Sequence, residues 1–121
     1  MRAPLGRIVI YTRKIDEMAA FYSARFGFTV RRTKGDRIVE LVPTAGGATI
    51  LLHPAGKAQK MGQALVKLAF DVADVAAEWA RLIAAGVAVG ALHRADGYQF
   101  ANLKDPSGNY VQVSSRACRI A

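Results

Sequence analysis

The sequence predicts an α+β fold in which one β-α-β-β-β pattern occurs twice. Two segments with helical spacing of apolar residues each end at a glycine, Gly27 and Gly86, and these glycines lie 59 residues apart in a chain of 121. One alternating or β-branched run precedes each segment and three follow it. Each repeat therefore predicts a four-stranded sheet with one helix packed on one face.

The first module spans about residues 5–54. It opens with a β-branched run at 7–11, which is typical of a strand. A helix is predicted at 16–26, because Met18, Phe21 and Tyr22 recur at i, i+3 and i+4. Further strands are predicted at 28–32, 38–42 and 48–53. A polar linker follows at 55–63, where two glycines and two lysines interrupt the pattern.

The second module spans about residues 64–115. Its strands are predicted at 65–70, 87–92, 98–103 and 110–114. A helix begins at Asp71 or Asp74, either of which can cap it. Its buried face is predicted to carry Val75, Trp79, Leu82 and Ile83.

Residues 105–109, Asp-Pro-Ser-Gly-Asn, predict a tight turn between the last two strands. Pro106 fixes φ at the first central position, and Gly108 and Asn109 tolerate positive φ. The carboxylate of Asp105 can accept hydrogen bonds from the backbone that follows it.

The composition indicates one globular domain, 1–121. The chain is 52% hydrophobic, and no run approaches the ~18 apolar residues of a membrane span. The first residues lack the plan of a signal peptide. The single cysteine, Cys118, excludes an internal disulfide framework and favours a cytoplasmic location, and we expect its thiol to be a bystander.

The formal net charge of +8 favours anionic partners. The densest basic patch, at 31–37, flanks a predicted hairpin tip at Gly35-Asp36. We favour a solvated turn over a nucleic-acid site there, because no recognition helix or stacking motif accompanies the patch.

Two motifs carry a resemblance to a known family. Phe21-Tyr22 with Phe26-Gly27-Phe28, and the turn at 105–109, resemble the vicinal oxygen chelate superfamily, which includes glyoxalase I, bleomycin-resistance proteins and extradiol dioxygenases. The resemblance covers roughly residues 5–115. It implies that the two modules form a cupped mixed β-sheet. Both motifs are structural, so they do not specify a reaction.

The resemblance also implies four metal-ligand positions. They fall on Arg7, Leu51, Leu65 and Gln112, and a slip of one residue gives Ile8, Leu52, Val66 and Val111. Metal-dependent members of the superfamily place His, Glu or Gln there. Only Gln112 could coordinate an ion, so we expect no metal and no other cofactor.

Strand alternation predicts that Arg7, Tyr11, His53, Lys67 and Gln112 line the cup, and we add Phe100 as an aromatic candidate for the same site. Structural alternatives remain open for several of them. Arg7 could pair with Glu40, His53 could be solvent-exposed or bonded to backbone, Lys67 could extend outward, and Tyr11 and Phe100 could be core.

We therefore expect a metal-free protein that binds a small neutral or anionic molecule in the cup and forms a homodimer. The alternative is an enzyme using the same cup. It would be a metal-dependent lyase or dioxygenase with its ligands elsewhere, or an acid/base enzyme using His53, Glu40 or Tyr11. A basic module for nucleic acid or an acidic protein ranks third.

Overall fold

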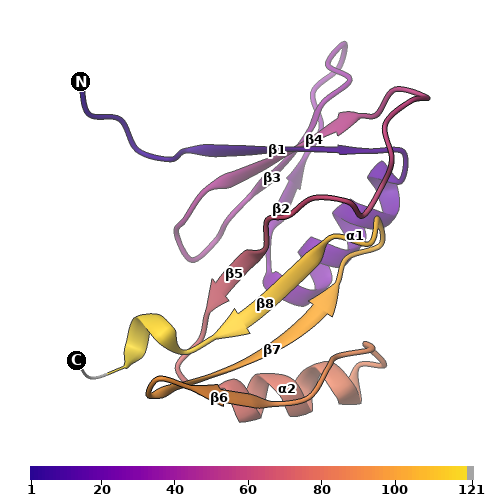
Figure 1. Cartoon of the computed structure of the whole chain (residues 1–121). Coiled ribbons are helices and arrows are strands. Elements are labelled where there is room, and N and C mark those ends of the chain that lie inside the picture. Colours follow the sequence, from indigo (N-terminus) through magenta and orange to yellow (C-terminus); the bar gives the residue numbers. More distant parts are fainter. Residues whose placement is uncertain (120–121) are drawn as a thin grey trace. The chain divides into compact units, whose positions relative to one another are not determined.

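The computed structural model describes residues 1–119 and divides the chain into two compact units, Met1–Met61 (unit 1) and Gly62–Ala121 (unit 2) (Figure 1). Within the described residues, each unit holds one α-helix and one four-stranded mixed sheet. The predicted α+β fold with two β-α-β-β-β modules is therefore confirmed. Neither α-helix in this part of the chain is long and apolar enough to cross a membrane.

The sheet of unit 1 has the strand order β1-β4-β3-β2, with β1 parallel to β4 and the other neighbours antiparallel. All four strands begin and end within one residue of the predicted ranges. Their bounds are Arg7–Thr12 (β1), Thr29–Arg31 (β2), Val39–Val42 (β3) and Thr49–Pro54 (β4).

Helix α1 (Ile15–Phe26) covers one face of this sheet. Met18 and Tyr22, which the helical spacing places on one face, are fully buried, and α1 packs against β3 and β4. Gly27 ends the helix with φ at 72°, in the left-handed region where a side chain would be strained. The core of unit 1 is completed by apolar residues of the sheet, namely Val39, Leu41, Ile50 and Leu52.

The sheet of unit 2 repeats this connectivity, with the order β5-β8-β7-β6 and β5 parallel to β8. A short 3-10 helix, η1 (Arg116–Cys118), follows the last strand. The strands are Leu68–Asp71 (β5), His93–Ala95 (β6), Tyr98–Lys104 (β7) and Tyr110–Ser114 (β8).

Helix α2 (Val75–Ala84) is capped by Asp74, whose Oδ1 accepts a hydrogen bond from Ala77 N at 3.0 Å. This resolves the choice between Asp71 and Asp74. Val75 and Leu82 are buried as predicted, but Ile83 is 47% exposed, so the buried stripe is narrower than the sequence indicates.

Strand β5 begins later than predicted. We expected a strand at 65–70, but Leu65 is fully exposed and the ladder starts with Leu68 opposite Val111. The reason lies in the neighbouring strand, because β8 begins only at Tyr110, after the turn. Residues well before Leu68 therefore have no paired neighbour, so the predicted start of the strand was wrong, while the strand itself is confirmed at Leu68–Asp71.

The predicted strand at 87–92 was also wrong. Only an isolated bridge joins Val89 to Leu103, and Gly90 N donates to Asn102 O at 2.8 Å. The indole Nε1 of Trp79 donates a hydrogen bond to Gly90 O at 2.9 Å. Residues 87–92 are thus held by individual contacts and not by a continuous ladder, and the edge strand of this sheet is β6.

A two-residue turn joins β6 to β7. Asp96 and Gly97 have φ of 46° and 83°, and positive φ at both central positions is what a type I′ hairpin requires. Asp-Gly is a strong sequence signal for such a hairpin, and this signal identifies His93–Ala95 as the strand.

The turn at 105–109 forms as predicted between β7 and β8. Asp105 is buried, and its Oδ1 accepts from Ser107 N and Asn109 N, each at 3.0 Å. Its Oδ2 accepts from Asn109 Nδ2 at 3.0 Å. Gly108 has φ of 83°, and Asn109 does not enter the positive-φ region.

Candidate ligand-binding site

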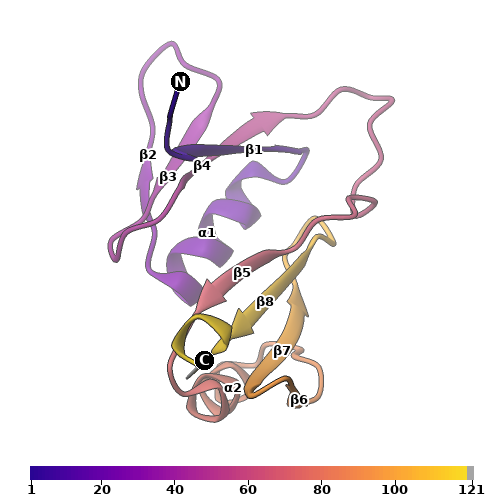
Figure 2. The ribbon, with the colours of Figure 1, turned by 60° about the vertical axis from the view of Figure 1, so that its left-hand side comes forward.

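Each sheet has one face covered by its own helix and one face without a helix, which we call the open face (Figure 2). Side chains alternate along a strand, so residues paired across the ladder share a face. In unit 1 the open face carries Arg7, Val9, Tyr11, Arg31, Glu40, Leu51 and His53. In unit 2 it carries Ala69, Asp71, His93, Ala95, Tyr98, Phe100, Asn102, Lys104, Tyr110, Gln112 and Ser114.

The open face of unit 1 carries one apolar pair and one aromatic pair along β1 and β4. Val9 and Tyr11 are both 47% exposed, and they pair across the ladder with Leu51 and His53. The rings of Tyr11 and His53 lie with centroids 4.8 Å apart. His53 Nδ1 donates to Pro54 O at 2.8 Å, which leaves its Nε2 as an acceptor.

Glu40 on this face pairs with Arg31, which lies directly opposite it on β2. Arg31 Nε donates to Glu40 Oε2 at 3.1 Å. The sequence alternative in which Glu40 pairs with Arg7 was therefore wrong, because Arg7 lies opposite Thr49 on the far side of β4.

The open face of unit 2 contains a polar cluster of Lys67, Asn102 and Gln112. Asn102 Oδ1 accepts from Lys67 Nζ and from Gln112 Nε2, each at 3.2 Å. Lys67 Nζ and Lys104 Nζ also lie 5.9 and 5.0 Å from the centre of the Tyr110 ring. The structure thus brings together two of the predicted site residues, Lys67 and Gln112.

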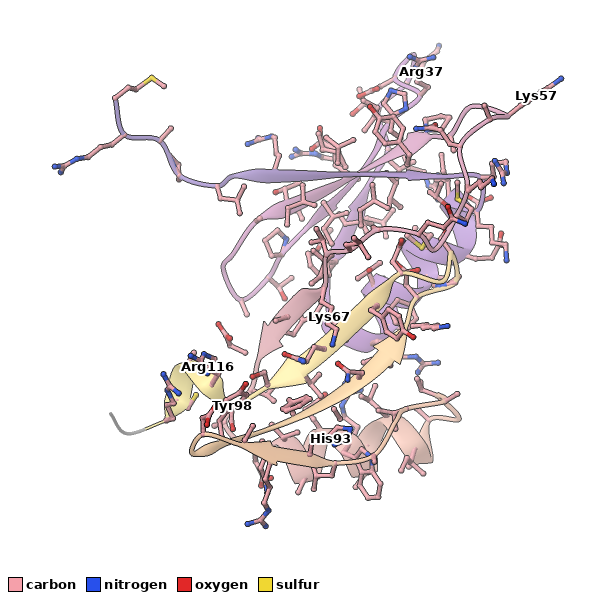
Figure 3. All side chains as sticks on the ribbon, viewed as in Figure 1. Arg37, Lys57, Lys67, His93, Tyr98 and Arg116 are labelled. Atoms are coloured by element: carbon pink, nitrogen blue, oxygen red, sulfur yellow. The ribbon has the colours of Figure 1, made fainter. Side chains whose placement is uncertain are left out.

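An aromatic row lies beside this cluster and consists of His93, Phe100 and Tyr98. The His93 and Phe100 rings are stacked at 5.0 Å and 29°, and the Tyr98 ring is 5.8 Å from that of Phe100. Arg116 places its guanidinium 5.1 Å from the centre of the Tyr98 ring. Figure 3 labels His93, Tyr98, Arg116 and Lys67 on this unit.

Sequence reasoning found Phe100 but missed His93, Tyr98 and Arg116. Tyr98 lies two residues before Phe100 on β7, so alternation along the strand would have placed it on the same face. His93 could have been found through the Asp96-Gly97 hairpin, which fixes the pairing of β6 with β7. The Arg116 contact depends on the path of η1 and had no sequence signal.

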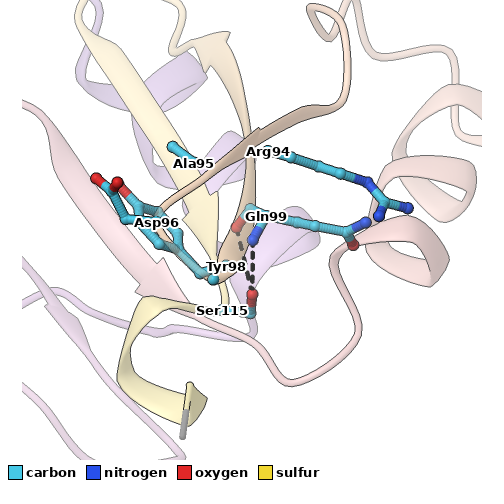
Figure 4. A pocket seen from close by; sticks show the side chains of 7 residues that line it. Arg94, Ala95, Asp96, Tyr98, Gln99 and Ser115 are labelled. Carbon is cyan, nitrogen blue, oxygen red and sulfur yellow. Dashed lines mark hydrogen bonds between the residues drawn. The ribbon is translucent and has the colours of Figure 1, made fainter. Parts of the chain in front are cut away.

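A shallow depression of about 570 Å³ lies at the β6–β7 hairpin (Figure 4). Its floor is fixed by hydrogen bonds between Gln99 and Ser115, with Gln99 N donating to Ser115 Oγ at 3.0 Å. Arg94 and Asp96 contribute opposite charges to its lining, and Tyr98 belongs both to it and to the aromatic row.

The residues at the implied metal positions do not fit a metal ion. Arg7 and Leu51 offer no suitable donor, and Leu65 lies outside the sheet. The amide nitrogen of Gln112 is bonded to Asn102. Across residues 1–119, no three or more His, Cys, Asp or Glu side chains gather in a group that could hold an ion.

Comparison with protein families gives one match. The sequence profile described as the Glyoxalase/Bleomycin resistance protein/Dioxygenase superfamily matches residues 5–113. A search of curated proteins gives no match.

Solved structures share the fold at low sequence identity. TnmS3, an antibiotic binding protein from Streptomyces sp. CB03234, is 21% identical with a TM-score of 0.76, covering 93% of this chain and 94% of its own. UcmS2 is 22% identical with a TM-score of 0.79, covering 95% and 99%. A lactoylglutathione lyase from Agrobacterium tumefaciens is 20% identical with a TM-score of 0.74, covering 98% and 97%. Because these identities are only 20–22%, and a binding protein and a lyase both appear, these likenesses show the fold alone.

Proposed function

The chain belongs to the glyoxalase/bleomycin resistance protein/dioxygenase superfamily, and from this premise we propose that it is a metal-free binding protein for a small neutral or anionic molecule. The chain is a single domain made of both modules, and the ligand lies on an open face of a sheet. The candidate contacts are Arg7, Tyr11 and His53 on the open face of unit 1, and Lys67, Phe100 and Gln112 on the open face of unit 2. The single cysteine supports a cytoplasmic location.

The observation that carries the proposal is the combination of polar cluster and aromatic row on the open face of unit 2. Small-molecule sites are mostly apolar and aromatic, with a few convergent polar groups that fix the orientation of the ligand. Phe100, Asn102 and Gln112 are half-buried, so their side chains are supported and yet reachable. The antibiotic-binding description of TnmS3 is consistent with such a role.

The charges on the open faces support a neutral or anionic ligand. Lys67, Lys104 and Arg116 surround the rings of unit 2. On unit 1 the carboxylate of Glu40 is already paired with Arg31. Asp71, at the end of β5, pairs with Ser114 across the ladder and so lies on the open face of unit 2 as a second carboxylate. A polycation would therefore meet like charge, which weakens binding and slows encounter.

Calorimetry tests the proposal. We expect binding by at least one member of a panel of aromatic carboxylates and phosphorylated metabolites, and none by bleomycin. Lys67→Met, for a ligand on unit 2, or Arg7→Gln, for a ligand on unit 1, removes one charged contact, which is worth about 1.5–3 kcal/mol and so weakens the binding of an anion about tenfold or more. Lys57→Met is the matched control, because Lys57 is exposed on the loop after β4. Micromolar binding of bleomycin, or equal losses in all three variants, would overturn the proposal.

Elemental analysis tests the metal-free part. Because Arg7, Leu51, Leu65 and Gln112 stand at the ligand positions, we expect the purified protein to carry no stoichiometric transition metal. About one ion per subunit, whose removal abolishes an activity, would contradict this.

The proposal includes a homodimer. Exposed apolar side chains on an open sheet face, such as Val9 and Tyr11, favour burial against a partner. Light scattering at micromolar concentration is expected to give twice the subunit mass. A monomer across the concentration range would rule the dimer out.

A second candidate function is acid/base catalysis by His53 and Tyr11. The contact between their rings and the hydrogen bond from His53 Nδ1 to Pro54 O favour it, because they orient Nε2 as a base. Turnover of a panel compound that is lost in His53→Gln with binding retained would support this candidate. Binding without turnover supports the binding protein.

A further inference from the structure

We propose that the open face of unit 2 selects a planar aromatic molecule carrying a carboxylate, with the ring on the His93–Phe100–Tyr98 row and the carboxylate at the Lys67–Asn102–Gln112 cluster. This inference rests on the proposed function and specifies the ligand class at that site.

The arrangement along β7 carries the first step. Tyr98, Phe100, Asn102 and Lys104 alternate onto the open face, so that neighbours among them lie about 7 Å apart along the strand. Their chemistry changes along this line from two rings to an amide and then to an ammonium. A ligand lying along β7 therefore meets aromatic side chains at one end and a cationic polar group at the other.

The aromatic half suits a flat ring. His93 and Phe100 are nearly parallel, with an angle of 29° between their planes, and Tyr98 is tilted 34° from Phe100. The three rings on neighbouring strands thus form one aromatic cluster, in which the ring centres of His93 and Tyr98 lie 5.0 and 5.8 Å from that of Phe100. A planar aromatic group gains stacking contacts there that a saturated ring of the same size cannot make.

The polar half suits an acceptor with negative charge. The one amide oxygen at its centre, Asn102 Oδ1, already accepts from both Lys67 and Gln112. The remaining capacity of Lys67 Nζ and Asn102 Nδ2 is for donation only. A carboxylate accepts from these donors with charge assistance, a neutral hydroxyl accepts more weakly, and an ammonium group is repelled by Lys67.

The test is calorimetric titration with three probes of one size: naphthalene-2-acetate, its fully saturated decahydro analogue and the uncharged naphthalene-2-acetamide. We expect the aromatic acid to bind about two- to tenfold more tightly than the saturated acid, the margin that stacking supplies. We expect the amide to bind about tenfold or more weakly than the acid, because it lacks the charge.

Variants assign each preference to its half of the face. Phe100→Leu should remove the preference for the aromatic acid over the saturated one, and Tyr98→Leu provides a second ring variant should Phe100→Leu fold poorly. Lys67→Met should remove the preference for acid over amide, and Lys57→Met should change neither. Circular dichroism and urea unfolding verify that each variant is folded.

The outcomes separate the inference from the proposed function. Equal binding of the aromatic and saturated acids, or an aromatic preference that persists in both ring variants, overturns the inference and leaves a binding protein of another specificity. Failure of every probe, together with failure of the wider panel of carboxylates and phosphorylated metabolites, overturns both.

Discussion

Unit 1 and unit 2 share one backbone plan but differ in their chemistry. Both order their strands with the first beside the fourth in parallel and the remaining pairs antiparallel. Residues 1–61 carry 11 Lys and Arg against 4 Asp and Glu, whereas residues 62–121 carry 6 against 5. The net charge of +8 thus belongs almost wholly to unit 1. The two units thus repeat one fold, whereas the side chains at alternating positions along their strands differ.

The open faces differ in the same way. Unit 1 presents Val9 and Leu51 beside one aromatic pair and one ion pair. Unit 2 presents a row of rings and a cluster of hydrogen-bonded amides. The sign of the whole-chain charge is therefore a poor guide to a ligand, because most of the cations lie on the unit with the more aliphatic face.

The largest expected effect tests whether the two cores contribute equally. Leu52 of β4 and Leu82 of α2 are both fully buried. We expect Leu52→Ala and Leu82→Ala each to lower the free energy of unfolding by about 2–5 kcal/mol, through lost apolar contact and the cavity left behind. Urea unfolding measures both. Ile83→Ala, next to Leu82 and exposed, is the control and should change stability by less than about 0.5 kcal/mol. A large loss of stability in only one of the two leucine variants would show that the two cores contribute unequally.

The turns that close the corresponding hairpins provide a second comparison. Asp105 in unit 2 is buried and accepts three hydrogen bonds, so Asp105→Ala leaves donors unsatisfied and should lower stability by about 1–3 kcal/mol. In unit 1, exposed Thr44 donates from Oγ1 to Gly27 O at 3.0 Å. Thr44→Ala should change stability by about 0.5–1 kcal/mol. Equal losses in chemical denaturation would contradict the difference between the turns.

The helix caps give a smaller effect. α2 has a side-chain cap from Asp74, whereas the side chain of Lys14, the N-cap residue of α1, does not cap its helix. Asp74→Ala should lower the stability by about 1 kcal/mol. Asp71→Ala, the other acid before α2, should have little effect in the same thermal unfolding experiment. A loss at Asp71 equal to that at Asp74 would reassign the cap.

The smallest expected effect concerns the Arg31–Glu40 pair on the open face of unit 1. The two side chains are 58% and 26% exposed, so their coupling should be only about 0.2–1 kcal/mol. A double-mutant cycle with Arg31→Gln and Glu40→Gln measures it. High salt should reduce the coupling further, and a coupling of several kcal/mol would show that the face is far less solvated than its exposure indicates.

The parts of the fold that the sequence predicts well are those with local signals. Gly27 ends α1 because it adopts the left-handed conformation, and Asp105 builds its turn from bonds within five residues. The misread strand at 87–92 has the apolar content of a strand, but pairing is decided by its neighbours. The true edge strand is three residues long and is marked mainly by its turn.

The candidate site was harder to predict because its contacts are non-local. Lys67 meets Asn102 across 35 residues, and Arg116 reaches Tyr98 through η1. Alternation indicates the face of the sheet on which a residue lies but not the register between strands, and the register decides which side chains are in contact. Alternation placed Gln112 on the open face, whereas the Arg31–Glu40 pair needed the register of β2 with β3.

The parallel pair in each sheet also sets an order of events in folding. Arg7 and Thr49 are 42 residues apart, and Leu68 and Val111 are 43 apart, whereas Lys104 and Tyr110 of the β7–β8 hairpin are 6 apart. Closing a long loop costs more chain entropy than closing a short one, so hairpins form early and distant pairs late. β1 and β5 are therefore the last strands to join their sheets. Until they do, β4 and β8 each expose an unpaired edge, and nascent chains at high concentration are most vulnerable there to pairing with one another.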